Sequence, residues 1–263
     1  MLFNKKKKKN KALTPAEKEE KFVKISTRLL MIVVILLAVA FSFLSILDRF
    51  KQSDLTALKE LAKEVNEDDI VTNPFFEADL NSAISKCQTA GLDIVDGNSF
   101  SLEKFNNVNI AISENITLTA AEFGAMYNNI YADAPDKYST ILRQLEFFKT
   151  ESGYKIKIVC TVDFKLLLNN LATSLTDLPT RIFVTSEAEI KNGVSSPLKL
   201  TYNALDETLS NQLSTSLNQS SGNTNVQTYF ATLISDFITK LTQRTNTGAT
   251  VDNDKITFSL KTE

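Results

Sequence analysis

Paired carboxylates are the groups in this sequence that most resemble catalytic residues, because two carboxyl groups at a suitable separation can act as acid and base. Asp68 and Asp69 are adjacent in a turn-prone segment, where carboxylates are usually solvated. Glu187 and Glu189 alternate along an expected strand and therefore fall on its polar face. Neither pair is accompanied by a nucleophile motif, a phosphate-binding loop or a metal-ligand pattern. We therefore expect no catalytic residues.

Histidine is absent from the chain, and this absence excludes several classes of reaction. Without an imidazole there is no Ser-His or Cys-His nucleophile pair and no HExxH zinc site. The chain has only two cysteines, which are too few for a structural zinc cluster. The sequence therefore predicts a protein that is not an enzyme and that has neither a metal site nor a cofactor.

The two cysteines each fall on the apolar face of an expected element, Cys87 on a helix and Cys160 on a strand. Outside the cytoplasm, a disulfide between them would stabilise the domain by about 2–4 kcal/mol. The alternative is a pair of buried thiols that pack as small hydrophobic side chains. We favour the thiols, because a disulfide requires a geometry that the sequence does not specify.

Charge is distributed unevenly along the 263 residues. Residues 1–28 carry ten basic and three acidic side chains, and residues 5–9 are five consecutive lysines. Residues 51–263 carry 18 basic and 27 acidic side chains, which gives this part a net charge of −9. An acidic body of this kind repels a phosphate backbone. We therefore expect no nucleic-acid partner.

Residues 29–47 form an apolar run of nineteen residues without a charge. At about 1.5 Å per residue, such a helix spans most of the roughly 30 Å hydrocarbon core of a bilayer. The basic residues precede it, so the positive-inside rule places the N terminus in the cytoplasm. One alternative is a signal peptide that is cleaved near residues 38–40, but the apolar run continues past that site. The other alternative is a buried core helix, but the basic residues before the run argue against it. We expect an uncleaved single-pass anchor in the cell membrane, with the bilayer as its partner.

The predicted organisation has four parts. They are a basic cytoplasmic tail at 1–28, a transmembrane helix at 29–47, a stalk or linker at 48–72 and an extracytoplasmic α+β domain at 73–263. Apolar residues at helical spacing between positions 55 and 65 suggest a short stalk helix. Asn73 and Pro74 mark the expected start of the domain, because this pair is typical of a turn or of a helix N terminus.

The domain is expected to be α+β, with long, mainly antiparallel strands packed against about five helices. Alternation of apolar and polar residues predicts strands at 108–112, 141–147, 154–164, 182–190, 198–202 and 256–260. Glu151-Ser152-Gly153 and Asn192-Gly193 are predicted hairpin turns. Helical spacing and capping signals predict helices at 73–87, 119–130, 167–175, 205–213 and 226–241. The helix at 119–130 opens with a Thr119–Glu122 capping box.

Three segments, in this order, resemble the YpmS-like membrane-anchored proteins of Gram-positive bacteria. The segments are LTAAEFGAMYNN (118–129), LPTRIFVTSEAEIKNG (178–193) and PLKLTYNALDETLS (197–210). That family is similar in layout to tubular lipid-binding (TULIP-like) domains, in which a curved antiparallel sheet wraps a helix and leaves an apolar groove. The resemblance covers about residues 110–210 and concerns the order of elements. It implies a single anchor, an extracytoplasmic domain and the handling of a lipid or another apolar ligand.

The candidate lining of an apolar ligand site comes from the helix at 226–241 and the strand at 154–164. The residues are Tyr229, Phe230, Leu233, Phe237, Ile158 and Val162. The apolar stripe of this helix can line a groove, lie on a membrane or pack in the core, and core packing is the most common use of such a stripe. Lys240 is the only basic residue on its polar face, which disfavours docking to an anionic membrane.

Two hypotheses of function follow. In the first, the outer domain binds a lipid or another apolar ligand at the cell envelope. In the second, the chain is a non-enzymatic structural or interaction protein that recruits an envelope protein partner.

Overall fold

The computed structural model describes residues 24, 26–28, 30–35, 57, 60–61, 63–106, 112–168, 179–203, 205–220 and 225–260. The chain forms two compact units, Met1–Arg49 and Phe50–Glu263. In the first unit the described residues are helical, and the six apolar side chains from Leu30 to Ile35 are exposed. None of the described helices has both the length and the apolar character that a membrane crossing needs. Most of the expected anchor at 29–47 lies outside the described residues.

The second unit is α+β, and all its described strand pairs are antiparallel, as the sequence predicts. The larger sheet has the order β4-β5-β6-β7, with β4 at Ile141–Thr150, β5 at Gly153–Asp163, β6 at Arg181–Lys191 and β7 at Val194–Tyr202. The second sheet has the order β3-β9-β8, with β3 at Ile116–Thr119, β8 at Thr247–Asp252 and β9 at Lys255–Leu260. A small ribbon pairs β1 (Val95–Asp96) with β2 (Ser99–Phe100).

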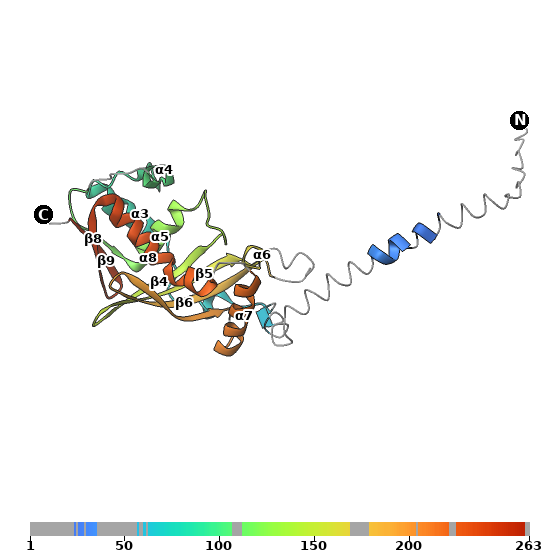
Figure 1. Cartoon of the computed structure of the whole chain (residues 1–263). Coiled ribbons are helices and arrows are strands. Elements are labelled where there is room, and N and C mark those ends of the chain that lie inside the picture. The colour runs from blue at the N-terminus through green and yellow to red at the C-terminus, as the bar shows by residue number, and fades with distance from the viewer. Residues whose placement is uncertain are drawn as a thin grey trace, which may run out of the picture. The chain divides into compact units, whose positions relative to one another are not determined.

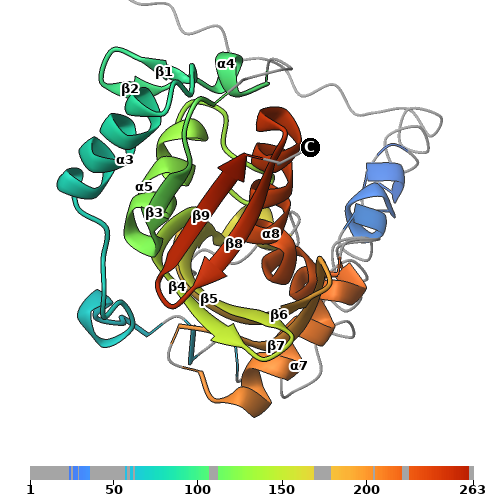
Figure 2. The same ribbon diagram turned by 90° about the vertical axis from the view of Figure 1, so that its left-hand side faces the viewer.

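Helices cover these sheets (Figure 1). They are α3 (Glu77–Thr89), α4 (Leu102–Asn106), α5 (Ala120–Ile130), α6 (Phe164–Leu167), α7 (Glu207–Ser220) and α8 (Val226–Thr245), and a 3₁₀ turn, η1, spans Glu67–Asp69. α5 packs on β4, and α8 packs on β6, β7 and β8 (Figures 1 and 2). The core of the unit therefore lies between α5, α8 and the strands on which they pack.

Both predicted hairpin turns of the larger sheet are confirmed. β4 and β5 are joined through Glu151-Ser152, and β6 and β7 through Asn192-Gly193. Asn192 and Gly193 both have positive φ, +51° and +77°, which is the conformation that a tight two-residue hairpin needs. The register places Cys160 opposite Val184 on the buried face.

The capping box of α5 is also confirmed. The Thr119 Oγ1 accepts from the Glu122 N–H at 3.1 Å, and the Thr119 N–H donates to Glu122 Oε2 at 2.7 Å. Glu122 is 5% exposed and also accepts from Lys86 Nζ at 2.6 and 2.7 Å and from the Ser82 hydroxyl. These contacts fasten α5 to α3.

The predicted start of the helix at Asn73 is wrong by a few residues, because α3 begins at Glu77. The Asn73 N–H donates to Gln144 Oε1, a fully buried side chain on β4, so this part of the chain is tied to that strand before the helix begins. The Asp79 carboxylate then accepts from the Phe76 N–H at 2.7 Å and starts the helix there.

Other expectations fall partly outside the described residues. The predicted strand at 108–112 is described only at Ile112, which is not in a strand. The predicted helix at 167–175 is described only as far as Leu168, and α6 ends at Leu167.

The segment 48–72 was expected to be a stalk or linker, but its residues Ala57 and Leu61 are fully buried. The Leu61 carbonyl accepts from Asn203 Nδ2 at 3.2 Å. This segment therefore contributes to the packing of the second unit.

Candidate functional site

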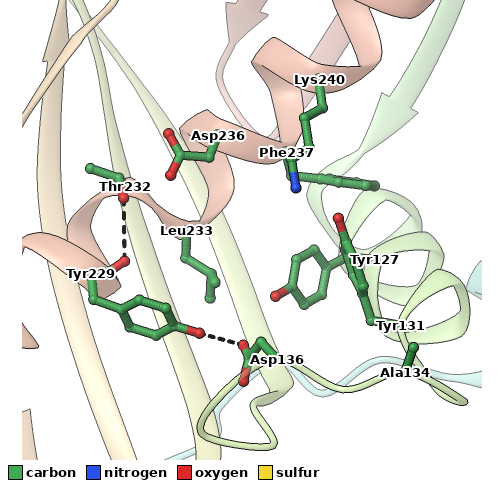
Figure 3. Close-up of a pocket in the computed structure, with 10 residues that line it drawn as sticks. All are labelled: Tyr127, Tyr131, Ala134, Asp136, Tyr229, Thr232, Leu233, Asp236, Phe237 and Lys240. Carbon is green, nitrogen blue, oxygen red and sulfur yellow. Dashed lines mark hydrogen bonds between the residues drawn. The ribbon is translucent and has the colours of Figure 1, made fainter. Parts of the chain in front are cut away.

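A cavity of about 220 Å³ lies where α5, α8 and the loop 131–140 meet (Figure 3). We call it the Tyr127 cavity. Its walls are Tyr127, Tyr131, Ala134, Asp136, Tyr229, Thr232, Leu233, Asp236, Phe237 and Lys240. Most of these side chains are aromatic or aliphatic, and the charged ones are the exceptions.

Helical spacing explains how the walls are formed. Tyr229, Leu233 and Phe237 are four residues apart on α8 and therefore lie on one face of that helix. Tyr127 on α5 and Tyr131 just beyond its last residue have the same spacing. The Asn225 side chain caps the start of α8 by accepting from the Thr228 N–H. The buried side chains along one face of α8 hold the helix against the core. The two helices thus each direct a row of mainly aromatic side chains into the Tyr127 cavity.

The rings contact one another across that space. The ring centroids of Tyr127 and Phe237 are 5.2 Å apart with an edge-to-face angle of 88°. Those of Tyr127 and Tyr131 are 4.9 Å apart, and those of Tyr131 and Phe237 are 6.0 Å apart. Such offset and edge-to-face pairs are the favoured arrangements of aromatic rings. The aromatic wall is therefore well ordered by its own contacts.

Asp136 shapes the loop that closes the cavity. Its Oδ1 accepts from the backbone N–H groups of Tyr138 and Thr140, both at 2.9 Å. Its Oδ2 accepts from the Tyr229 hydroxyl, which ties the loop to α8. Ser139 has φ of +49°, a strained conformation for a non-glycine residue that these hydrogen bonds hold. One carboxylate therefore fixes both the loop and the position of a cavity ring.

Burial raises the pKa of Tyr229 above its usual value, and the nearby Asp136 charge raises it further. Burial, then Asp136, raises the pKa of Tyr127 in the same way. Both side chains are consequently neutral phenols near pH 7, able to donate one hydrogen bond each. Tyr229 uses its hydrogen bond on Asp136.

The hydroxyl of Tyr127 differs from that of Tyr229. The Tyr127 residue is only 3% exposed, and its hydroxyl forms no hydrogen bond with another described residue. Figure 3 shows this hydroxyl directed into the cavity, toward the side where Asp136 and Leu233 lie. A hydroxyl that faces an open cavity can exchange hydrogen bonds with water or with a ligand there.

A second cavity of about 400 Å³ shares Tyr131 with the first and has Asn128, Ser139, Thr140 and Arg181 in its walls. Several of its polar groups are already engaged. Asn128 exchanges two hydrogen bonds with the backbone of Leu142, at 2.8 and 2.9 Å. The Arg181 guanidinium donates to the Ser139 carbonyl at 2.9 Å. These contacts brace the loop that also closes the Tyr127 cavity.

The structure brings together three of the six residues proposed from the sequence. Tyr229, Leu233 and Phe237 line the Tyr127 cavity. Phe230, Ile158 and Val162 are buried core residues, at most 2% exposed, and do not line it. Phe230 follows Tyr229 on α8 and therefore points about 100° away from it, into the core, whereas Ile158 and Val162 enter the core from β5.

Seven lining residues were not anticipated as site residues, among them Tyr127, Tyr131, Asp136 and Lys240. The four-residue spacing of the two tyrosines is a visible signal of a shared face. Nothing in the sequence indicates that this face meets α8, about a hundred residues later. The role of Asp136 depends on a loop conformation that is equally invisible in the sequence.

The remaining chemically interesting residues have ordinary surroundings. Glu189 forms an ion pair with Lys191 at 3.1 Å, and Glu187 lies opposite Lys199 on β7. Cys87 and Cys160 are buried free thiols. Burial raises the pKa of Cys87 to about 12, and it raises the pKa of Cys160 as well. Within the described part of the chain, no group of three or more potential ligands could hold a metal ion.

Comparison of the chain with protein-family models, with curated proteins and with solved structures finds no match. The likeness to YpmS-like proteins therefore stays a resemblance in the order of elements. What the chain does has to be argued from the Tyr127 cavity and the residues around it.

Proposed function

We propose that the chain is a single-pass membrane protein whose second unit, outside the cytoplasm, binds a small and mainly apolar ligand in the Tyr127 cavity. The observation that carries this proposal is the cavity itself, with its aromatic walls and its unpartnered hydroxyl. Apolar walls with a few converging polar groups are the usual composition of a small-molecule site.

The volume limits the size of the ligand. An apolar cavity of roughly 150 Å³ holds a benzene molecule, and sites for drug-sized ligands begin near 300 Å³. At about 220 Å³, the Tyr127 cavity fits one ring with a small substituent. Within the expectation of a lipid or another apolar ligand, this size favours a ring-sized molecule over a whole lipid.

The location outside the cytoplasm rests on the sequence and on the first unit. Leu30 to Ile35 form helix, and each of these residues is at least 48% exposed. Six exposed apolar side chains in a row are unfavourable in water and favourable in lipid. With the basic residues before them, this supports an anchor whose N terminus is cytoplasmic.

Cavity filling tests the ligand proposal. We expect the full chain in lipid nanodiscs to show saturable contacts to toluene in saturation-transfer NMR, and Leu233→Trp to abolish them by filling the cavity. Leu198→Trp is the matched control, because Leu198 is 48% exposed on β7 and does not line the cavity. Absence of toluene contacts in the native chain, or equal contacts in Leu233→Trp, would contradict the proposal.

Cysteine labelling tests the topology. The native thiols are buried, so a cysteine introduced at an exposed site should dominate labelling of intact cells. We expect Glu151→Cys, in the exposed turn between β4 and β5, to react with a membrane-impermeant maleimide. Lys6→Cys should react only after the membrane is opened. The reverse result would overturn the orientation.

The interaction hypothesis has one observation in its favour. β7 is the last strand of its sheet, and Val194 and Leu198 on it are 66% and 48% exposed. Exposed edge strands with apolar side chains are common places for another chain to add. A photo-crosslinking residue at position 194 in intact cells should then capture a partner, whereas recovery of the uncrosslinked chain alone would count against this hypothesis.

A further inference from the structure

We infer that the ligand of the Tyr127 cavity is a small organic cation, in which an ammonium group is attached to a ring-sized apolar body. This inference rests on the proposed function and specifies the chemistry of that site. Three observations carry it: the charge inside the cavity, an ammonium that the protein already holds at the same corner, and the free Tyr127 hydroxyl.

The charge inside the cavity is negative. Among the lining residues, Asp236 and Lys240 are exposed at the rim, where their opposite charges offset each other. Asp136 is half-buried and is the remaining charged side chain in the walls. An anionic ligand would therefore approach a carboxylate of like charge, whereas a cation would meet an opposite charge.

The corner formed by Asp136 and Tyr229 already holds an ammonium group of the protein. Lys137 Nζ lies 4.6 Å from the ring centroid of Tyr229 and 4.7 Å from that of Tyr138. These distances are typical of a cation over an aromatic face. Lys137 is not among the residues that line the cavity, so it leaves the interior open. The Tyr229 ring and the Asp136 carboxylate also line the cavity, so a second cation can reach them from the cavity side.

The hydrogen-bond acceptors of the cavity also fit an ammonium group. A carboxylate has about four acceptor positions, and Asp136 uses three of them on two backbone N–H groups and the Tyr229 hydroxyl. The Tyr127 oxygen has no described partner and faces the same space (Figure 3). A primary ammonium can donate to both oxygens at once. Its ring would then lie against Leu233 and Phe237.

Three probes of similar size and different charge separate this inference from the proposed function. They are benzylamine, benzyl alcohol and benzoate, titrated into the full chain in nanodiscs at neutral pH. Since a hydrogen bond to a charged group is worth more than one to a neutral group, we expect benzylamine to bind about tenfold more tightly than benzyl alcohol. Benzoate should bind more weakly than either.

Tyr127→Phe provides a second measurement on the same site. It removes one oxygen without changing the ring, so it should weaken benzylamine about tenfold and leave toluene nearly unchanged. Equal affinities for benzylamine and benzyl alcohol, or tighter binding of benzoate, would overturn the cationic ligand and leave the cavity as an apolar site. Absence of binding by all three probes and by toluene would overturn the proposed function as well.

Discussion

Replacement of Glu122 provides a quantitative test of how α5, which carries Tyr127, is held in place. The carboxylate is 5% exposed and accepts hydrogen bonds from Lys86, Ser82 and the Thr119 N–H. Glu122→Ala would remove all of these. A capping interaction is worth about 1 kcal/mol and a hydrogen bond to a charged group about 1.5–3 kcal/mol. Because Lys86 can recover some hydration at the surface, we expect the free energy of unfolding to fall by about 3 kcal/mol.

The pH dependence of stability is a second signature of the same carboxylate. Burial by itself would raise the pKa of Glu122, but the hydrogen bonds from Lys86, Ser82 and Thr119 together lower it below the ordinary value of 4.5. Its contribution to stability is thus complete above the unfolded-state pKa and is lost as the pH falls through the lower folded-state pKa. Glu122→Gln should lose this part of the acid dependence.

Urea unfolding of the full chain, followed by tyrosine fluorescence between pH 3 and pH 7, would measure both effects. Glu77→Gln is the control, because Glu77 is an exposed residue in the first turn of α3. We expect it to leave the unfolding free energy within about 0.5 kcal/mol of the native chain. The reasoning would be refuted if Glu122→Ala behaved like this control, or if Glu122→Gln kept the full acid dependence.

Other substitutions and treatments have definite expected outcomes. Gly124→Ala should destabilise the chain by about 1–3 kcal/mol in urea unfolding, despite better helix propensity, because the new Cβ would overlap the Phe75 ring; an unchanged midpoint would contradict that packing. Cys87 and Cys160 should titrate as two free thiols in denaturant without reductant, and neither should react with maleimide at pH 7 in the folded chain. Tyr229→Phe should cost about 1 kcal/mol through loss of the Asp136 bond, and a native-like stability would contradict it.

Local patterns predicted the larger sheet well. Buried positions alternate along the whole of β6, and tight turns such as Asn192-Gly193 specify their own backbone conformation. The same holds for α5, whose capping box is encoded within four residues. These features could be predicted because neighbouring residues determine them.

Elements that depend on distant contacts were missed or misplaced. In β8 only Thr247 is buried, so the strand lacks the apolar alternation that identifies strands from sequence. Its pairing with β9 is what makes it a strand. α3 starts only at Glu77, and the N–H groups of Thr72 and Asn73 before it donate to Gln144, some seventy residues later. The Tyr127 cavity exists only because α5 and α8 meet and because Asp136 folds the loop between them. None of these relations is local in sequence.

The most direct test of the central claim is an NMR titration of the full chain in nanodiscs with ¹³C-labelled leucine methyl groups and benzylamine as the ligand. Leu233 lines the Tyr127 cavity, and Leu198 lies exposed on β7, away from its walls. The account predicts a saturable shift of the Leu233 methyl signals with no change at Leu198. Unchanged Leu233 signals at saturating benzylamine and toluene would contradict it.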